Sequence, residues 1–119
     1  MTKEEILAMK PGNELDALIG KEIMEWTPEE IEVNMLNLPH HFSWSPSTDI
    51  SDAYSEVLEK LKEKWDCIEL TWDVGAWDIH LENYSAGKEL YLGRGAGETY
   101  EKLPEAICKV ALLAKLERR

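Results

Sequence analysis

The chain has 119 residues, 44% of them hydrophobic and five of them tryptophan. It can therefore bury the core of one domain, expected to span residues 1–119, without disulfides or metal ions, and its composition excludes intrinsic disorder. A formal net charge of -11 repels nucleic acid and anionic membranes and attracts basic protein surfaces. An acidic surface also keeps a small protein soluble, and this simpler explanation stays open.

Two further features bear on the compartment. Cys67 and Cys108 form no CxxC pair or disulfide framework, so we expect reduced, packed thiols. The N-terminal stretch is charged throughout, and no apolar run approaches the roughly 20 residues of a membrane span. We therefore expect a cytoplasmic protein.

The first 26 residues predict two helices. The pattern Thr2-Lys3-Glu4-Glu5 is a capping box at the start of a short helix, which Pro11-Gly12 ends. Asn13 can cap a second helix over residues 14–26, where Gly20 costs about 1 kcal/mol against alanine unless another element packs closely there. One apolar face of this helix is formed by Leu15, Leu18, Ile19 and Ile23.

Residues 27–49 contain three prolines and no clean period. A structureless stretch this long is uncommon in a compact domain, so we expect an ordered functional loop or a short hidden element. Residues 29–36 are compatible with a helical turn or a strand. Aromatic side chains here are candidates for a stacking or interface surface, or anchor the loop on the core. These candidate binding residues are Trp26, His40, His41, Phe42 and Trp44.

A third helix is predicted over residues 47–65, capped by Thr48 or Asp49. Its continuous apolar stripe consists of Ile50, Ala53, Tyr54, Val57, Leu58 and Leu61.

The period then changes to two, which predicts three antiparallel strands over residues 67–73, 77–83 and 88–93. Each strand has one apolar face, on which we expect Trp72 and Trp77 to belong to the core, whereas His80 falls on the polar face. The last helix, residues 104–119, is apolar nearly all round and is expected to be buried on more than one side.

The connection between the last strand and the last helix contains Gly93, Gly95 and Gly97 around Arg94. Such a turn can present backbone amides to an anion, and Arg94 is a candidate binding residue. The spacing is not GxGxxG, and Glu98 would oppose a phosphate. We expect mainly a tight connection between strand and helix.

The chain contains no catalytic motif such as GxSxG, a P-loop or HExxH. Neither cysteine has a partner at metal-ligand spacing, and His40 and His41, being adjacent, point in different directions on regular structure. We therefore predict no catalytic residue, no metal site and no cofactor, and a protein that is not an enzyme.

Three stretches in this order resemble the phage ABA-sandwich domain family: residues 1–24, 47–64 and 98–117. The resemblance covers nearly the whole chain. It implies an α+β fold, a three-layer α/β/α sandwich with a small, mainly antiparallel sheet of about three strands. No catalytic residues are established for the family, so none is carried over to this chain.

The resemblance also implies a class of roles, because small phage accessory proteins often bind a host component. We expect a non-enzymatic protein of the host cytoplasm, acting as a homo-oligomer and docking its acidic surface on a basic host protein. Alternatively, it sequesters a signalling nucleotide, with aromatic residues stacking on the base and Arg94 or lysines binding phosphate. A structural or virion-associated role is a third hypothesis. No direct binding to nucleic acid or membrane is expected.

Overall fold

The computed structural model describes residues 1–35 and 44–117. In this part of the chain, five helices and one three-stranded sheet follow in the predicted order. The fourth helix is interrupted by a π-helical turn, so it carries three consecutive labels, α4, η1 and α5. The elements are α1 (Lys3–Ala8), α2 (Asn13–Glu22), α3 (Pro28–Met35), α4 (Ile50–Asp52), the π-helical η1 (Ala53–Val57), α5 (Leu58–Lys62), β1 (Cys67–Asp73), β2 (Ala76–Asn83), β3 (Lys88–Leu92), the 3₁₀ turn η2 (Arg94–Ala96) and α6 (Leu103–Glu117).

Two capping boxes start the helices at the N-terminal end. The predicted box at Thr2 is confirmed, since its hydroxyl accepts from the Glu5 amide at 3.2 Å and the Glu5 carboxylate accepts from the Thr2 amide at 3.1 Å. Thr27 and Glu30 repeat the same exchange at 3.2 and 3.0 Å, with Pro28 as the first helical residue. The helical alternative for residues 29–36 is thus confirmed through Met35.

The segment before α4 is tied to α2. The Ser47 amide donates to the buried Asp16 carboxylate at 2.7 Å, and the Ser47 hydroxyl accepts from the Gly12 amide at 2.9 Å. Burial raises the pKa of Asp16, although the hydrogen bonds from Ser47 oppose the shift. Asp49 then caps α4, as predicted, by accepting from the Ser51 and Asp52 amides.

The apolar stripe of the third helix is only partly correct. Ala53, Val57 and Leu61 are buried in the core, whereas Ile50 and Tyr54 are exposed. The physical reason is the π-helical turn over Ala53–Val57. Its extra residue changes the angular spacing of the side chains, so Tyr54 inside the turn and Ile50 before it leave the face that an unbroken α-helix would present.

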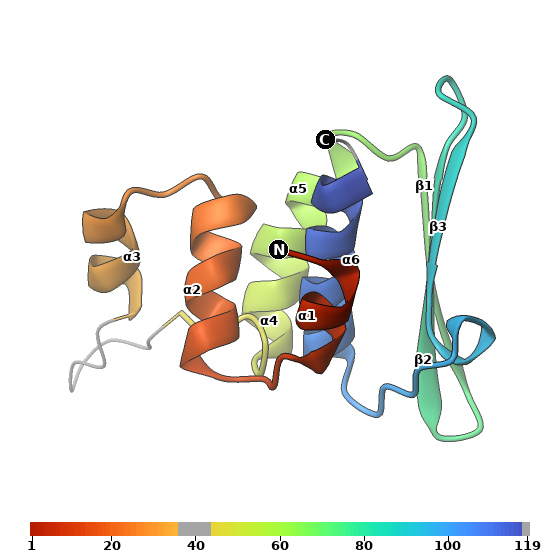
Figure 1. Cartoon of the computed structure of the whole chain (residues 1–119), viewed down its shortest axis with the longest axis horizontal. Helices are drawn as coiled ribbons and strands as arrows, with labels where there is room; N and C mark the ends of the chain where they lie inside the picture. Colours follow the sequence, from red (N-terminus) through yellow and green to blue (C-terminus); the bar gives the residue numbers. More distant parts are fainter. Residues whose placement is uncertain (36–43, 118–119) are drawn as a thin grey trace.

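The sheet is an antiparallel meander of order β1-β2-β3, as predicted. Its apolar face packs against α6, which lies between the sheet and the other helices (Figure 1). The prediction that Trp72 belongs to the core is wrong, because this side chain is 53% exposed. Figure 1 shows the reason: the β1–β2 hairpin extends past the end of α6. Trp77 is half-buried and lies 5.4 Å from Trp72 between ring centroids.

Helix α6 is buried along most of its length, from Ala106 to Ala114, which confirms the prediction from its all-round apolar pattern. It also buries a charge: Lys109 is 3% exposed. Its ammonium donates to the Glu105 carboxylate at 2.7 Å and to the Leu7 carbonyl at 2.9 Å. This network attaches α1 to α6. The α+β class is therefore confirmed, with the sheet packed on helices, and no helix of the described ranges is long and apolar enough to cross a bilayer.

Candidate functional site

The predicted binding residues do not gather at one place. Trp26 lies two residues before the start of α3, whereas Arg94 begins η2 beside the sheet. These elements lie at opposite ends of the long axis (Figure 1). Three further candidates, His40, His41 and Phe42, lie outside the described residues. Trp26 and Arg94 consequently do not belong to one site.

The two described loop tryptophans pack on each other. Their ring centroids are 4.5 Å apart, and Trp44 is only 9% exposed. Trp26 also lies over Gly20, where an added Cβ would come within 3.0 Å of its ring, so close packing explains this glycine in α2. These contacts favour the alternative in which Trp26 and Trp44 anchor the segment, and their role in binding stays a prediction.

The glycine-rich connection already binds an anionic group of the chain itself, the Asp78 carboxylate. The Arg94 amide donates to Asp78 Oδ1 at 3.0 Å, and Arg94 Nη2 lies 3.3 Å from Asp73 Oδ2 and 3.8 Å from Asp78 Oδ2. Gly93, with φ of 141°, passes so close to Asp78 that an added Cβ would collide with the carboxylate. A phosphate at this turn would have to displace Asp78, and binding by Arg94 would compete with two aspartates.

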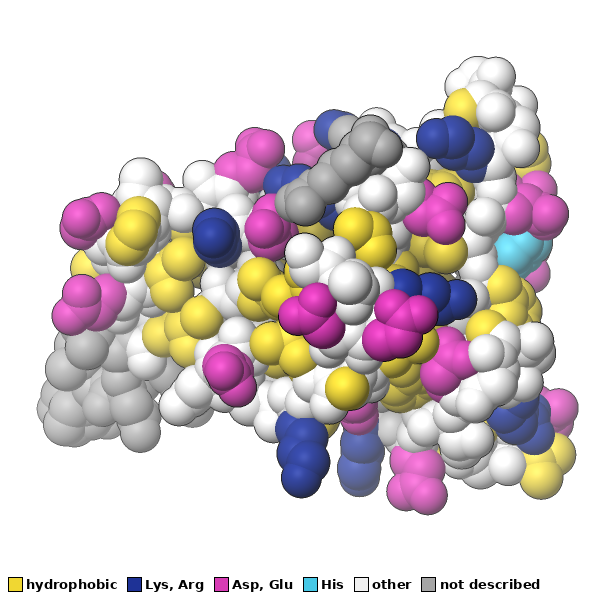
Figure 2. Space-filling model, viewed as in Figure 1, with side chains coloured by type: hydrophobic (Ala, Val, Ile, Leu, Met, Phe, Trp, Pro, Cys, Tyr) yellow, Lys and Arg dark blue, Asp and Glu magenta, His cyan; other side chains and the backbone are white. Residues whose placement is uncertain are grey.

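The polar face of the sheet lies opposite the face that packs on α6, and we call it the outer sheet face. Strand alternation places its residues, and the register brings Glu69 opposite His80, His80 opposite Tyr91 and Glu82 opposite Glu89. In Figure 2 the histidine of the described residues (cyan) is visible at the right-hand margin of the view, with acidic side chains beside it. The residues of this face include Cys67, Glu69, Thr71, Asp78, His80, Glu82, Glu89 and Tyr91.

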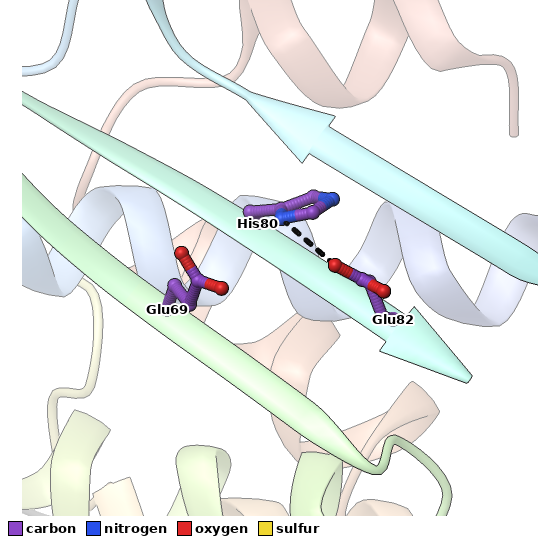
Figure 3. Close-up of side chains that lie close together, drawn as sticks. All are labelled: Glu69, His80 and Glu82. Carbon is purple, nitrogen blue, oxygen red and sulfur yellow. Dashed lines mark ion pairs between the residues drawn. The ribbon is translucent and has the colours of Figure 1, made fainter. Parts of the chain in front are cut away.

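His80 lies at the centre of this face and is partly buried. Its Nε2 is 2.9 Å from Glu89 Oε1, and its Nδ1 is 3.5 Å from Glu82 Oε1. Glu69 approaches from β1, so that Glu69, His80 and Glu82 converge (Figure 3). The Tyr91 ring is 6.2 Å from the imidazole between centroids. A histidine predicted only to lie on the polar face of its strand is thus surrounded by three carboxylates.

Sequence reasoning placed His80 on the polar face but missed its three acidic neighbours. The signal was present in the tight Val74-Gly75 turn, because a two-residue hairpin fixes which residues face each other. Counting back from this turn pairs Glu69 with His80, as the structure does.

A cavity of about 200 Å³ lies between α2, α5 and α6. Its lining includes Lys60, Lys64 and Lys115, but Glu22 and Glu63 pair with two of these lysines at 3.4 and 3.6 Å. Drug-sized ligands usually occupy about 300–1,000 Å³. The cavity is therefore smaller than such ligands need, and its lysines are largely paired with glutamates, so it does not suit a nucleotide.

Taken together, these features define a small α+β domain: a central apolar helix, a three-stranded meander and an outer sheet face that is strongly acidic. A family model described as the Phage ABA sandwich domain matches residues 17–112. The chain belongs to this family, which confirms the resemblance. No curated protein and no solved structure matches the chain.

Proposed function

We propose that the protein is a non-enzymatic phage accessory protein that docks its outer sheet face on a basic surface of a host protein in the host cytoplasm. The observation that supports this proposal is the gathering of carboxylates from three strands around His80, next to an accessible tyrosine. Tyr91 is 41% exposed, and Tyr84, in the β2–β3 turn, is 66% exposed. Exposed tyrosine is enriched in protein interfaces, where charged residues lie mainly at the rim.

The charge of this face is not balanced locally. Among its described neighbours the nearest guanidinium, that of Arg94, is already shared between Asp73 and Asp78. Glu69, Glu82 and Glu89 surround a single imidazole. Such a face, on a chain of net charge -11, steers a basic partner toward it, and the attraction weakens as salt screens the charges.

Charge reversal on the outer sheet face tests the proposal. Glu69→Lys/Glu89→Lys and the matched control Glu29→Lys/Glu32→Lys change the net charge equally, but the control residues lie on α3 at the other end of the molecule. Host lysate is passed over each immobilised protein, and bound proteins are identified by mass spectrometry.

We expect a basic host protein to bind the wild type and the control but not the sheet variant. Its capture should fall as the salt concentration rises from 50 to 300 mM. These concentrations are chosen to span about a twofold change in Debye length. Equal capture by both variants would contradict docking through this face. A partner retained at high salt would contradict an electrostatic mechanism.

Two alternatives remain as proposals with their own tests. Sequestration of a signalling nucleotide predicts that one member of a nucleotide panel raises the melting temperature. At 100-fold excess over Kd, the expected gain in the free energy of unfolding is about 2.7 kcal/mol. A structural or virion-associated role predicts that the protein is found in purified particles. Size-exclusion chromatography with light scattering tests whether the protein is a homo-oligomer.

A further inference from the structure

The side chains of Glu69, His80 and Glu82 each offer one ligand atom, and these atoms all lie within 4.8 Å of one another. Zinc binds nitrogen and carboxylate oxygen at about 2.0–2.2 Å, which in a tetrahedron places neighbouring ligand atoms about 3.4 Å apart. The distance of 3.5 Å between His80 Nδ1 and Glu82 Oε1 matches this edge. Glu69 is exposed, so a rotation of its side chain completes the set (Figure 3).

The other side of the imidazole indicates which nitrogen is free to bind. Glu89 Oε1 lies 2.9 Å from His80 Nε2, and an ionised carboxylate only accepts hydrogen bonds, so Nε2 carries the hydrogen. In the neutral ring the lone pair then lies on Nδ1, which faces Glu82. A lone pair directed at carboxylates is unfavourable unless a cation, either a proton or a metal ion, lies between them.

We propose that Glu69, His80 and Glu82 bind a divalent transition-metal ion, zinc by their donor set, with Glu89 as the positioning residue. Histidine that binds a metal through one nitrogen usually donates from the other to a carboxylate, and the Glu89 carboxylate lies 2.9 Å from the other nitrogen of His80. An imidazole ligand favours zinc over magnesium or calcium, which prefer oxygen alone. Two carboxylates neutralise the charge of the ion, and the remaining coordination position is open to water.

This proposal does not rest on docking to a host protein, and the zinc titration below uses the protein alone. Its competitor is a proton on Nδ1, which would hold the same three side chains together without metal. Because the two experiments are independent, a failed zinc titration would leave the docking proposal untouched, and a failed capture experiment would leave the zinc site untouched.

Isothermal titration with zinc chloride, and with magnesium chloride for comparison, tests the site. We expect one zinc ion per chain and no heat from magnesium at the same concentration. His80→Gln and Glu69→Gln should lose the zinc heat, whereas Glu56→Gln, an exposed residue of η1, should retain it. Zinc binding of equal strength in His80→Gln, or none in the wild type, would overturn the proposal.

Two further variants exclude other ligands. The double variant His40→Gln/His41→Gln removes the remaining histidines of the chain, and Cys67→Ser removes a thiol that lies 3.7 Å from Glu69. Both should keep the zinc heat of the wild type. If binding were lost in either one but kept in His80→Gln, zinc would lie elsewhere.

Glu89→Gln tests the positioning role, because loss of such an outer carboxylate weakens metal affinity by about 10–100-fold. Long-range proton–nitrogen NMR spectra of the imidazole provide a readout that a merely structural role would not move. Zinc should shift the Nδ1 resonance of His80 and leave Nε2 protonated in the wild type. A zinc-induced shift at Nε2 instead, or unchanged affinity in Glu89→Gln, would refute the assignment.

Discussion

Replacement of Gly93 by alanine tests how the strand-to-helix connection is held. Gly93 has φ of 141°, and a Cβ there would collide with Asp78 Oδ1 and lie 3.0 Å from Asp78 Cα. The chain offers a matched control in Gly12, which has φ of 144° but nothing within 4 Å of its added Cβ. The two alanine variants share the backbone strain, and only one of them meets Asp78.

The magnitude follows from these contacts. Alanine at either position costs about 1–3 kcal/mol of backbone strain. At Gly93 the Asp78 carboxylate must also move, and it loses the hydrogen bond from the Arg94 amide at 3.0 Å, which is worth about 1.5–3 kcal/mol for a charged acceptor. Crowding against the Asp78 backbone adds about 1 kcal/mol or more. We expect Gly93→Ala to destabilise the protein by about 3 kcal/mol more than Gly12→Ala.

Urea denaturation followed by tryptophan fluorescence measures both free energies of unfolding. Adding Asp78→Ala to Gly93→Ala should recover part of the loss, because it removes the carboxylate from the collision. Free energies for Gly93→Ala and Gly12→Ala that agree within about 0.5 kcal/mol, the usual limit of additivity, would refute the reasoning. So would a double variant whose losses simply add.

Three other outcomes follow from buried groups. Because the pKa of Asp16 is raised in the folded state, this residue contributes stability at low pH, and the contribution is lost as pH rises through the folded pKa. Asp16→Asn, which can keep the hydrogen bond from Ser47, should therefore be more stable than wild type at pH 7. Its advantage should vanish below the ordinary value of 3.8, measured by urea denaturation at both pH values. Lys109→Met should cost about 2–3 kcal/mol because it strands the Glu105 carboxylate, and adding Glu105→Gln should recover part of this loss. Burial raises the pKa of Cys108 well above its usual range, so a thiol reagent should label only one cysteine until urea unfolds the chain.

Much of the local structure could be predicted because its causes are local. The capping box at Thr2 and the cap at Asp49 are contacts over two or three residues, and the box at Thr27 could have been recognised by the same pattern. The meander followed from alternation and tight turns. The buried α6 followed from an apolar pattern with no polar side wide enough to face water.

The errors at Trp72 and Tyr54 have two causes that local patterns do not contain: the extent of a neighbouring element and an interruption within a helix. Alternation assigned Trp72 to the apolar face of β1, but it cannot say where the covering helix ends, and the hairpin extends beyond it. Tyr54 fits an unbroken α-helical stripe, yet it lies inside the π-helical turn, whose extra residue changes the direction of its side chains. Helical periodicity carries no information about such an interruption.

The amino-acid sequence by itself determined the α+β class, the order of the elements and the acidic charge, because these depend on composition and on spacing along the chain. Only the tertiary structure decided which side chains meet. It neutralised Arg94 with Asp78 and brought Glu69, His80 and Glu82 together on the outer sheet face. Such contacts join residues from different strands, so they depend on register and on how closely the backbone turns, which residue patterns specify only in part.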